Sequence, residues 1–111
     1  MNIRIEDGVA RITMSGRFDF ELQRSFTEAC APLMLAKDVH NIEVELAGVD
    51  HLDSSALGML VRLKVRAMGS NKTVTLLNPS CIASHVLEVA NFNHLFTISR
   101  KPSPPSFAVS C

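Results

Sequence analysis

Apolar residues in this chain repeat every second residue in some stretches and every three to four residues in others. This alternation constrains the fold more than any other feature of the sequence. A two-residue period indicates a β-strand with one buried face, whereas a period of 3.6 residues indicates an amphipathic helix. The two periods predict the element order ββαβαβαβ. The predicted strands span about residues 3–5, 10–14, 42–46, 73–77 and 95–98, and the predicted helices about 20–33, 54–68 and 80–90.

This order predicts a mixed sheet. Asp7 and Gly8 form a strong turn pair between the first two strands, which indicates an antiparallel hairpin. Strands separated by a helix need a crossover connection and are therefore parallel. Because the strands alternate and are not solid apolar runs, the helices are expected mainly on one face, with the other face partly open. The predicted fold class is α/β, in a single domain.

Local signals set the expected ends of the elements. Asp19 is placed to cap the first helix, and Pro32 lies inside that helix, which is expected to kink or finish near the proline. Ser15 and Gly16 are expected to close the second strand. The alternation of the third strand stops after residue 46, so residues 47–52 are expected to form a loop.

Length, charge and cysteine usage exclude several function classes. Residues 1–100 suit one domain, and the Pro/Ser-rich residues 101–111 are predicted to be disordered. Eleven basic and eleven acidic residues cancel, so direct nucleic-acid binding and membrane insertion are not expected. The start of the chain lacks the apolar run of a signal peptide, and the three cysteines are too widely spaced for a disulfide framework or a zinc motif. A cytoplasmic location is therefore expected.

The segment Asp53-Ser54-Ser55-Ala56-Leu57-Gly58 opens the second predicted helix and carries the functional interpretation. Asp53 is in a capping position, and a helix start of this composition is common in proteins without a special function. At about 100° per residue, Ser55 falls on the same side of the helix as Gly58 and Arg62. Ser55 is therefore expected to point outward beside the bare surface of Gly58, where a partner or a kinase can reach it.

Residues 53–58 resemble the Asp-Ser-Ser-Gly-Leu-Gly signature of STAS domains in bacterial anti-sigma factor antagonists, with Ala56 where that family usually has glycine. Ser15-Gly16-Arg17-Phe18-Asp19 resembles the family's Gly-x-x-Asp loop, and Asn78-Pro79 and residues 91–96 resemble its closing segment. The resemblance covers about residues 2–100, and the tail offers no counterpart of the family's usual final helix. A short motif supported by matching element order is more specific than the motif alone.

The resemblance implies a STAS-like fold and a phosphorylation-controlled partner switch in which Ser55 is the modified serine. The unphosphorylated domain of such proteins binds an anti-sigma factor, often a serine kinase of the histidine-kinase-like ATPase fold. Phosphorylation ends this binding, and a PP2C-type phosphatase restores it. No cofactor, metal or catalytic residue is expected. The residues expected to bind the partner are Asp19, Asp53, Ser54, Ser55, Gly58, Met59 and Arg62.

Other interpretations of the same residues have less support. His51, Asp53 and Ser55 are residue types that hydrolases use, but a catalytic triad is defined by spatial geometry and not by closeness in sequence. The four histidines lack metal-ligand spacing. A different class of function is a constitutive STAS-type adaptor subunit of a transporter ATPase complex, which would not need Ser55. A small-ligand binding module is a third possibility.

Overall fold

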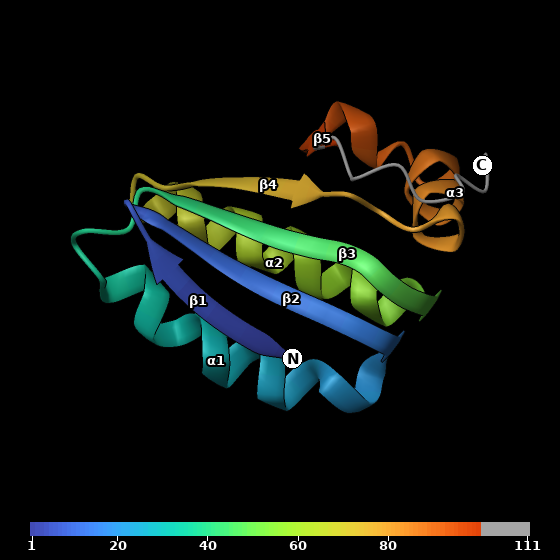
Figure 1. Cartoon of the computed structure of the whole chain (residues 1–111), viewed down its shortest axis with the longest axis horizontal. Helices are drawn as coiled ribbons and strands as arrows, with labels where there is room; N and C mark the ends of the chain where they lie inside the picture. The colour runs from blue at the N-terminus through green and yellow to red at the C-terminus, as the bar shows by residue number, and fades with distance from the viewer. Residues whose placement is uncertain (101–111) are drawn as a thin grey trace.

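The computed structural model describes residues 1–100 and has a five-stranded mixed sheet at its centre (Figure 1). The predicted α/β class and the order of strands and helices are confirmed, and the predicted disordered tail, residues 101–111, lies outside the described residues. The sheet order is β1-β2-β3-β4-β5. The elements are β1 (Asn2–Glu6), β2 (Val9–Phe18), η1 (Phe20–Leu22), α1 (Gln23–Leu35), β3 (Asn41–Leu52), α2 (Ser54–Gly69), β4 (Thr73–Leu77), α3 (Cys81–Val89), η2 (Phe92–His94) and β5 (Thr97–Ser99).

The first two strands form the predicted hairpin. β1 pairs antiparallel with β2, and the turn residues Asp7 and Gly8 have φ values of 50° and 80°. Two successive residues at positive φ are what a tight hairpin turn needs, and the Asp-Gly pair adopts that geometry readily. The three remaining neighbour pairs, β2 with β3, β3 with β4 and β4 with β5, are parallel.

One face of the sheet packs against helices. Helices α1 and α2 lie behind the sheet in the view of Figure 1. The strand side chains that point toward them alternate with polar residues and are completely buried, as expected for a half-covered sheet. They include Ile12, Val44 and Leu76, each 0% exposed.

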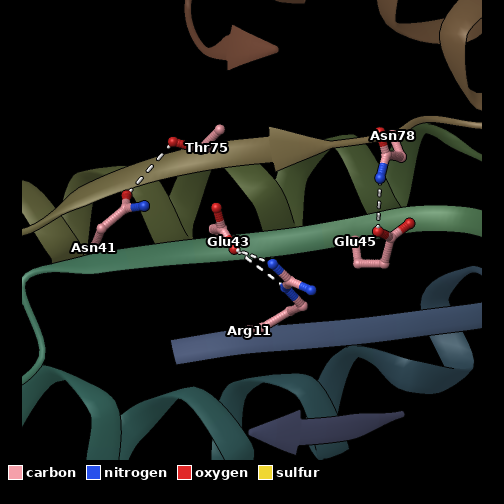
Figure 2. A network of polar contacts seen from close by, with 6 residues as sticks. All are labelled: Arg11, Asn41, Glu43, Glu45, Thr75 and Asn78. Atoms are coloured by element: carbon pink, nitrogen blue, oxygen red, sulfur yellow. Dashed lines mark hydrogen bonds and ion pairs between the residues drawn. The ribbon is translucent and has the colours of Figure 1, made fainter. Parts of the chain in front are cut away.

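The other face is polar, as the alternation predicts. Figure 2 shows side chains from β2, β3 and the end of β4 forming contacts across this face. An ion pair joins Arg11 to Glu43 at 3.0 Å. The amide of Asn78 donates to Glu45 at 3.2 Å, and the Thr75 hydroxyl donates to Asn41 at 3.4 Å. These neighbouring-strand pairs support the sheet without an apolar layer on this side.

The second and third strands are longer than predicted. The expected end at Ser15 and Gly16 and the expected loop at residues 47–52 are both wrong, because β2 runs to Phe18 and β3 runs to Leu52. The register between the two strands shifts twice, between Thr13 and Ser15 and between Gly16 and Arg17. At each shift β3 advances one residue more than β2, as in a β-bulge.

These bulges explain why sequence periodicity misses the end of β3. The buried residues change from every second position to every third, at Leu46, Val49 and Leu52. An extra residue in a strand reverses which face the following side chains occupy, so a three-residue spacing keeps apolar side chains on the core side. A prediction that assumes a strict two-residue period therefore places the end of β3 too early.

The helix boundaries are close to those predicted, with one difference in α1. A 3₁₀ turn occupies residues 20–22, and α1 then continues past Pro32 as far as Leu35. Helix α2 starts at Ser54 as expected, and Ser80 caps α3 by accepting from the Ala83 amide at 3.1 Å. Cys81 at the start of α3 is disulfide-bonded, which the number and spacing of the cysteines do not predict.

A buried lysine closes the end of the sheet where β3 and β4 begin. The ammonium group of Lys72 donates to the carbonyl oxygens of Ala36 and Val39, each at 2.7 Å, and the residue is only 7% exposed. Carbonyl partners compensate a buried charge by hydrogen bonding. This contact ties the segment after α1 to the start of β4, at the opposite end of the sheet from the start of α2.

Candidate functional site

The candidate site lies where β2 and β3 end. Phe18 and Leu52 are paired across these parallel strands, so the residues that follow them, Asp19 and Asp53, leave the same edge of the sheet side by side. The Asp19 carboxylate accepts from the Glu21 amide at 3.0 Å. The structure thus brings the two aspartates to one edge, and each is the cap of a helical segment.

The capping of α2 fixes how the serine segment begins. The Asp53 carboxylate accepts from the Ala56 amide at 3.0 Å, and the Asp53 carbonyl accepts from the Leu57 amide at 3.1 Å. Asp53 has extended backbone angles, with φ −109° and ψ −177°, so the chain passes from strand to helix within one residue. Ser54 and Ser55 consequently occupy the first turn of α2, where backbone N–H groups lack helical acceptors.

Both serines lie at the surface of the first turn of α2. Ser54 is exposed, whereas Ser55 is half-buried. Ser55 is therefore accessible in part, and it is the less exposed of the two serines.

Gly58 leaves open space one turn further along the helix. A Cβ atom added at this position would have Arg62 Nη1 as its nearest neighbour, at 3.8 Å, and would meet no backbone. The Arg62 guanidinium therefore reaches back over Gly58 toward the start of the helix.

Two of the predicted partner-binding residues are buried. Asp19 is 6% exposed and interacts with Arg17, whose Nε lies 3.3 Å from Asp19 Oδ2. Met59 is 2% exposed and belongs to the core. Met59 therefore does not provide the apolar surface beside Gly58 that the sequence predicts. Asp19 contributes to the edge by capping η1. The remaining predicted partner-binding residues are accessible at least in part: Asp53, Ser54, Ser55, Gly58 and Arg62.

Phe20 is a site residue that the sequence analysis does not identify. It follows the buried Asp19 directly and is 63% exposed. One sequence signal could have identified Phe20. It lies outside the apolar stripe of α1, so the helix pattern does not predict that its ring is buried. An exposed aromatic ring at the rim of a polar edge is a common feature of protein interfaces.

A small hollow lies between α1 and α2. It has a volume of about 50 Å³ and is lined by residues that include Phe26, Cys30 and Met59. Burial raises the pKa of the Cys30 thiol to about 11, against a smaller lowering effect of the Arg66 charge. This volume is well below the roughly 300 Å³ at which ligand pockets usually begin, so the hollow does not suit a cofactor.

Within residues 1–100, no group of three or more histidine, cysteine or acidic side chains is arranged to hold a metal ion. None of the helices in this part of the chain has the length and hydropathy needed to cross a membrane. The site is therefore a surface built from two capped helix starts, and its distinctive chemistry is two hydroxyl groups in the first turn of a helix.

Comparison with known proteins gives matches to a family model and to a relative. The family model described as Mlab, STAS domain matches residues 1–98. A STAS-domain containing protein from Pseudomonas aeruginosa (strain UCBPP-PA14) is 38% identical over 88 residues, which are 79% of this chain and 85% of that protein.

Solved structures share the fold at lower sequence identity. A candidate anti-sigma factor antagonist from Thermotoga maritima superimposes with a TM-score of 0.79 at 22% identity, over 91% of this chain and 86% of that one. The anti-sigma factor antagonist SpoIIAA in its unphosphorylated form gives a TM-score of 0.79 at 14% identity, over 92% and 88%. The phosphorylated form of SpoIIAA, a Bacillus cell fate determinant, gives 0.73 at 14% identity, over 92% and 91%.

Proposed function

The chain belongs to the STAS domain family, and on that premise we propose that it is an anti-sigma factor antagonist controlled by phosphorylation of Ser55. In this proposal the unphosphorylated domain binds an anti-sigma factor that is also a serine kinase of the histidine-kinase-like ATPase fold. A PP2C-type phosphatase reverses the modification. The observation that carries the proposal is the segment of residues 53–58, which matches the family motif and opens α2 at the site edge.

The surroundings of the serines support a reversible modification by a charged group. Free backbone N–H groups and the positive end of the helix dipole favour an anion in the first turn. A phosphate adds about 1.5 to 2 negative charges at pH 7, which changes a contact surface strongly without requiring a new fold. Since the family motif and these surroundings point to a contact surface, we propose binding and not catalysis.

The partner surface proposed here consists of Ser54, Ser55, Gly58, Arg62 and Phe20. Gly58 permits close approach of a partner's backbone because nothing projects from it. Phe20 supplies an apolar contact in place of the buried Met59, since its ring is 63% exposed. Interfaces of this kind commonly combine an exposed aromatic residue with a polar rim.

We expect Ser55, and not the more exposed Ser54, to accept the phosphate. The family motif supports Ser55, and a kinase that binds the edge can turn a half-buried serine toward its active site. Incubation of wild-type, Ser54→Ala and Ser55→Ala proteins with the cognate kinase, followed by phosphopeptide mapping, measures this directly. Modification that persists in Ser55→Ala and disappears in Ser54→Ala would show that exposure, and not the motif, selects the serine.

Replacing Gly58 with arginine should weaken partner binding by about tenfold or more while leaving the domain folded. The added Cβ atom is in ordinary contact with the flexible Arg62 side chain, at 3.8 Å. Loss of a helical glycine offsets the repulsion from the Arg62 charge, which is about 0.2–0.5 kcal/mol. Isothermal titration with the partner and thermal melting measure the two effects.

Gly69→Arg is the matched control for this substitution. Gly69 lies at the other end of the same helix, has nothing within 4 Å of an added Cβ, and gains the same charge. Its affinity for the partner should stay close to wild type. Equal losses in both variants would mean that the added charge, and not the site, is responsible.

A constitutive adaptor subunit of a transporter ATPase complex is the second candidate function. It is favoured by the matched family model, which is described as Mlab, STAS domain, and not as an antagonist. The two antagonist structures named above, from Thermotoga maritima and SpoIIAA, are 22% and 14% identical, which establishes only the shared fold. An adaptor would keep its full function in the Ser55→Ala and Ser55→Asp variants, whereas a switch would lose regulation in both.

A further inference from the structure

The outward side of α2 carries an apolar strip, most of which is exposed within residues 1–100. The α2 ridge, as we name it, consists of Leu57, Val61, Val65 and Met68. Val61 is 36% exposed, and Val65 and Met68 are each 63% exposed, while Leu57 is half-buried. The spacing of four, four and three residues aligns these side chains on one face of the helix.

The exposed part of this ridge, Val61, Val65 and Met68, is separate from the side of α2 that builds the core, whereas Leu57 packs partly against the core. The core side contains Ala56, Leu60 and Leu63, each at most 3% exposed. A helix that serves only as a layer over a sheet needs one apolar side, and its solvent side is normally charged or polar. The second apolar side of α2 therefore calls for a partner of its own.

The charges of α2 define the chemistry of that partner. The helix contains Arg62, Lys64 and Arg66 and no acidic residue. None of the three ion pairs found within residues 1–100 includes these cations. Lys64 is held in position by donating to the Leu95 carbonyl and by lying 5.3 Å from the centre of the Phe96 ring. By helical position, Lys64 borders one side of the ridge and Arg62 the other, whereas Arg66 is turned toward the hollow between α1 and α2.

We propose that the α2 ridge docks an acidic amphipathic helix of a partner protein. The apolar side of that helix packs on Val61, Val65 and Met68, and its carboxylates face the flanking cations. A second copy of this chain is a poor occupant, because two ridges in contact would bring four flanking cations together. A membrane is also a poor occupant, because the exposed part of the ridge has no tryptophan, phenylalanine or leucine to enter a lipid interface.

This inference goes beyond the proposed function, since residues 61–68 lie outside the family motif and the docking does not require Ser55. The test uses the whole unphosphorylated chain, labelled with ¹⁵N for NMR. The probe is a synthetic helical peptide of about 18 residues, with leucines along one face and glutamates on both flanks of that face. A matched peptide has lysine in place of every glutamate.

The glutamate peptide should produce saturable amide shift changes centred on residues 61–68, and the lysine peptide should not. Val65→Glu should raise the dissociation constant at least about tenfold, because it puts a carboxylate in the middle of the ridge. Val89→Glu is the control, since Val89 on α3 is 71% exposed and lies outside the ridge. That control should change the constant by less than about twofold, and both variants should melt within a few degrees of wild type.

Three results would overturn the proposal. The first is no saturable shift on the ridge up to about 1 mM glutamate peptide, or equal binding of both peptides. The second is binding to vesicles containing about one third phosphatidylglycerol that Val65→Glu abolishes, which would make the ridge a membrane surface. The third is concentration-dependent dimerisation that Val65→Glu abolishes, which would make the occupant a second copy. Failure here leaves the Ser55 switch intact, because phosphorylation is measured separately.

Discussion

Phosphorylation of Ser55 is expected to weaken partner binding at least 100-fold, while the free energy of unfolding changes by less than about 1 kcal/mol. In a complex, the phosphate must be desolvated against a surface shaped for a neutral hydroxyl. An uncompensated charge at a buried interface costs several kcal/mol, and each 1.4 kcal/mol is tenfold in affinity. This expectation rests on the proposed function.

The small effect on folding follows from terms that nearly cancel. The start of α2 favours the phosphate by about 0.3–1 kcal/mol, and the nearby Asp53 carboxylate opposes it by a similar amount. Arg62 adds a weak attraction, since its guanidinium lies over Gly58, one turn from Ser55, and exposed ion pairs contribute about 0.2–1 kcal/mol. The attraction from Arg62 should decrease with added salt, because the residue is exposed.

The measurement compares phosphorylated and unphosphorylated protein by partner titration, thermal melting and amide NMR shifts. Shift changes should stay within the start of α2 and the Asp19 edge. Ser54→Ala protein, phosphorylated in the same way, is the control, because it keeps the same charge at Ser55. Shifts that spread into β3 and β4, or a melting change of many degrees, would replace the local block with a conformational switch.

Replacing Phe18 with alanine should lower the free energy of unfolding by about 3–5 kcal/mol. Phe18 is 0% exposed, and the centre of its ring lies 5.5 Å from that of Phe26 on α1. The substitution removes a large buried side chain and leaves a cavity between the end of β2 and α1. Because Asp19 is the next residue, the site edge should lose its position as well.

Phe20→Ala is the matched control, two residues further along the chain. Phe20 is 63% exposed, so its truncation should change the free energy of unfolding by at most about 0.5 kcal/mol. Urea denaturation followed by circular dichroism measures both variants, and the m-values should stay equal if only stability changes. Similar losses in the two variants would contradict the assignment of Phe18 to the core and Phe20 to the surface.

Sequence patterns predict the strands and helices well where local signals agree. Helix α2 is the best example, because Asp53 caps it, an apolar side runs along it and Gly69 stops it at the predicted end. The end of β3 is missed, because two bulges change the spacing of its buried residues from two to three. A bulge depends on the neighbouring strand, and one strand's sequence does not reveal it.

The residues at the edge where α2 begins can be predicted from the sequence, but the exposure of their side chains cannot. Asp19 and Asp53 are caps as expected, since that role depends on local backbone geometry. Ser55 is less exposed than Ser54, a difference that depends on the neighbouring elements and that helical position alone does not predict. Met59 fails as a surface residue because it belongs to the core side of α2.

The paired length of β3 has a mechanical consequence. Its pairing with β2 continues to Leu52, and α2 begins two residues later at Ser54. Only Asp53 separates a strand held in the sheet from a capped helix, so the chain has no slack there to act as a hinge. A group attached to the first turn of α2 is therefore expected to leave the end of β3 in place and to act on a molecule that contacts the surface there.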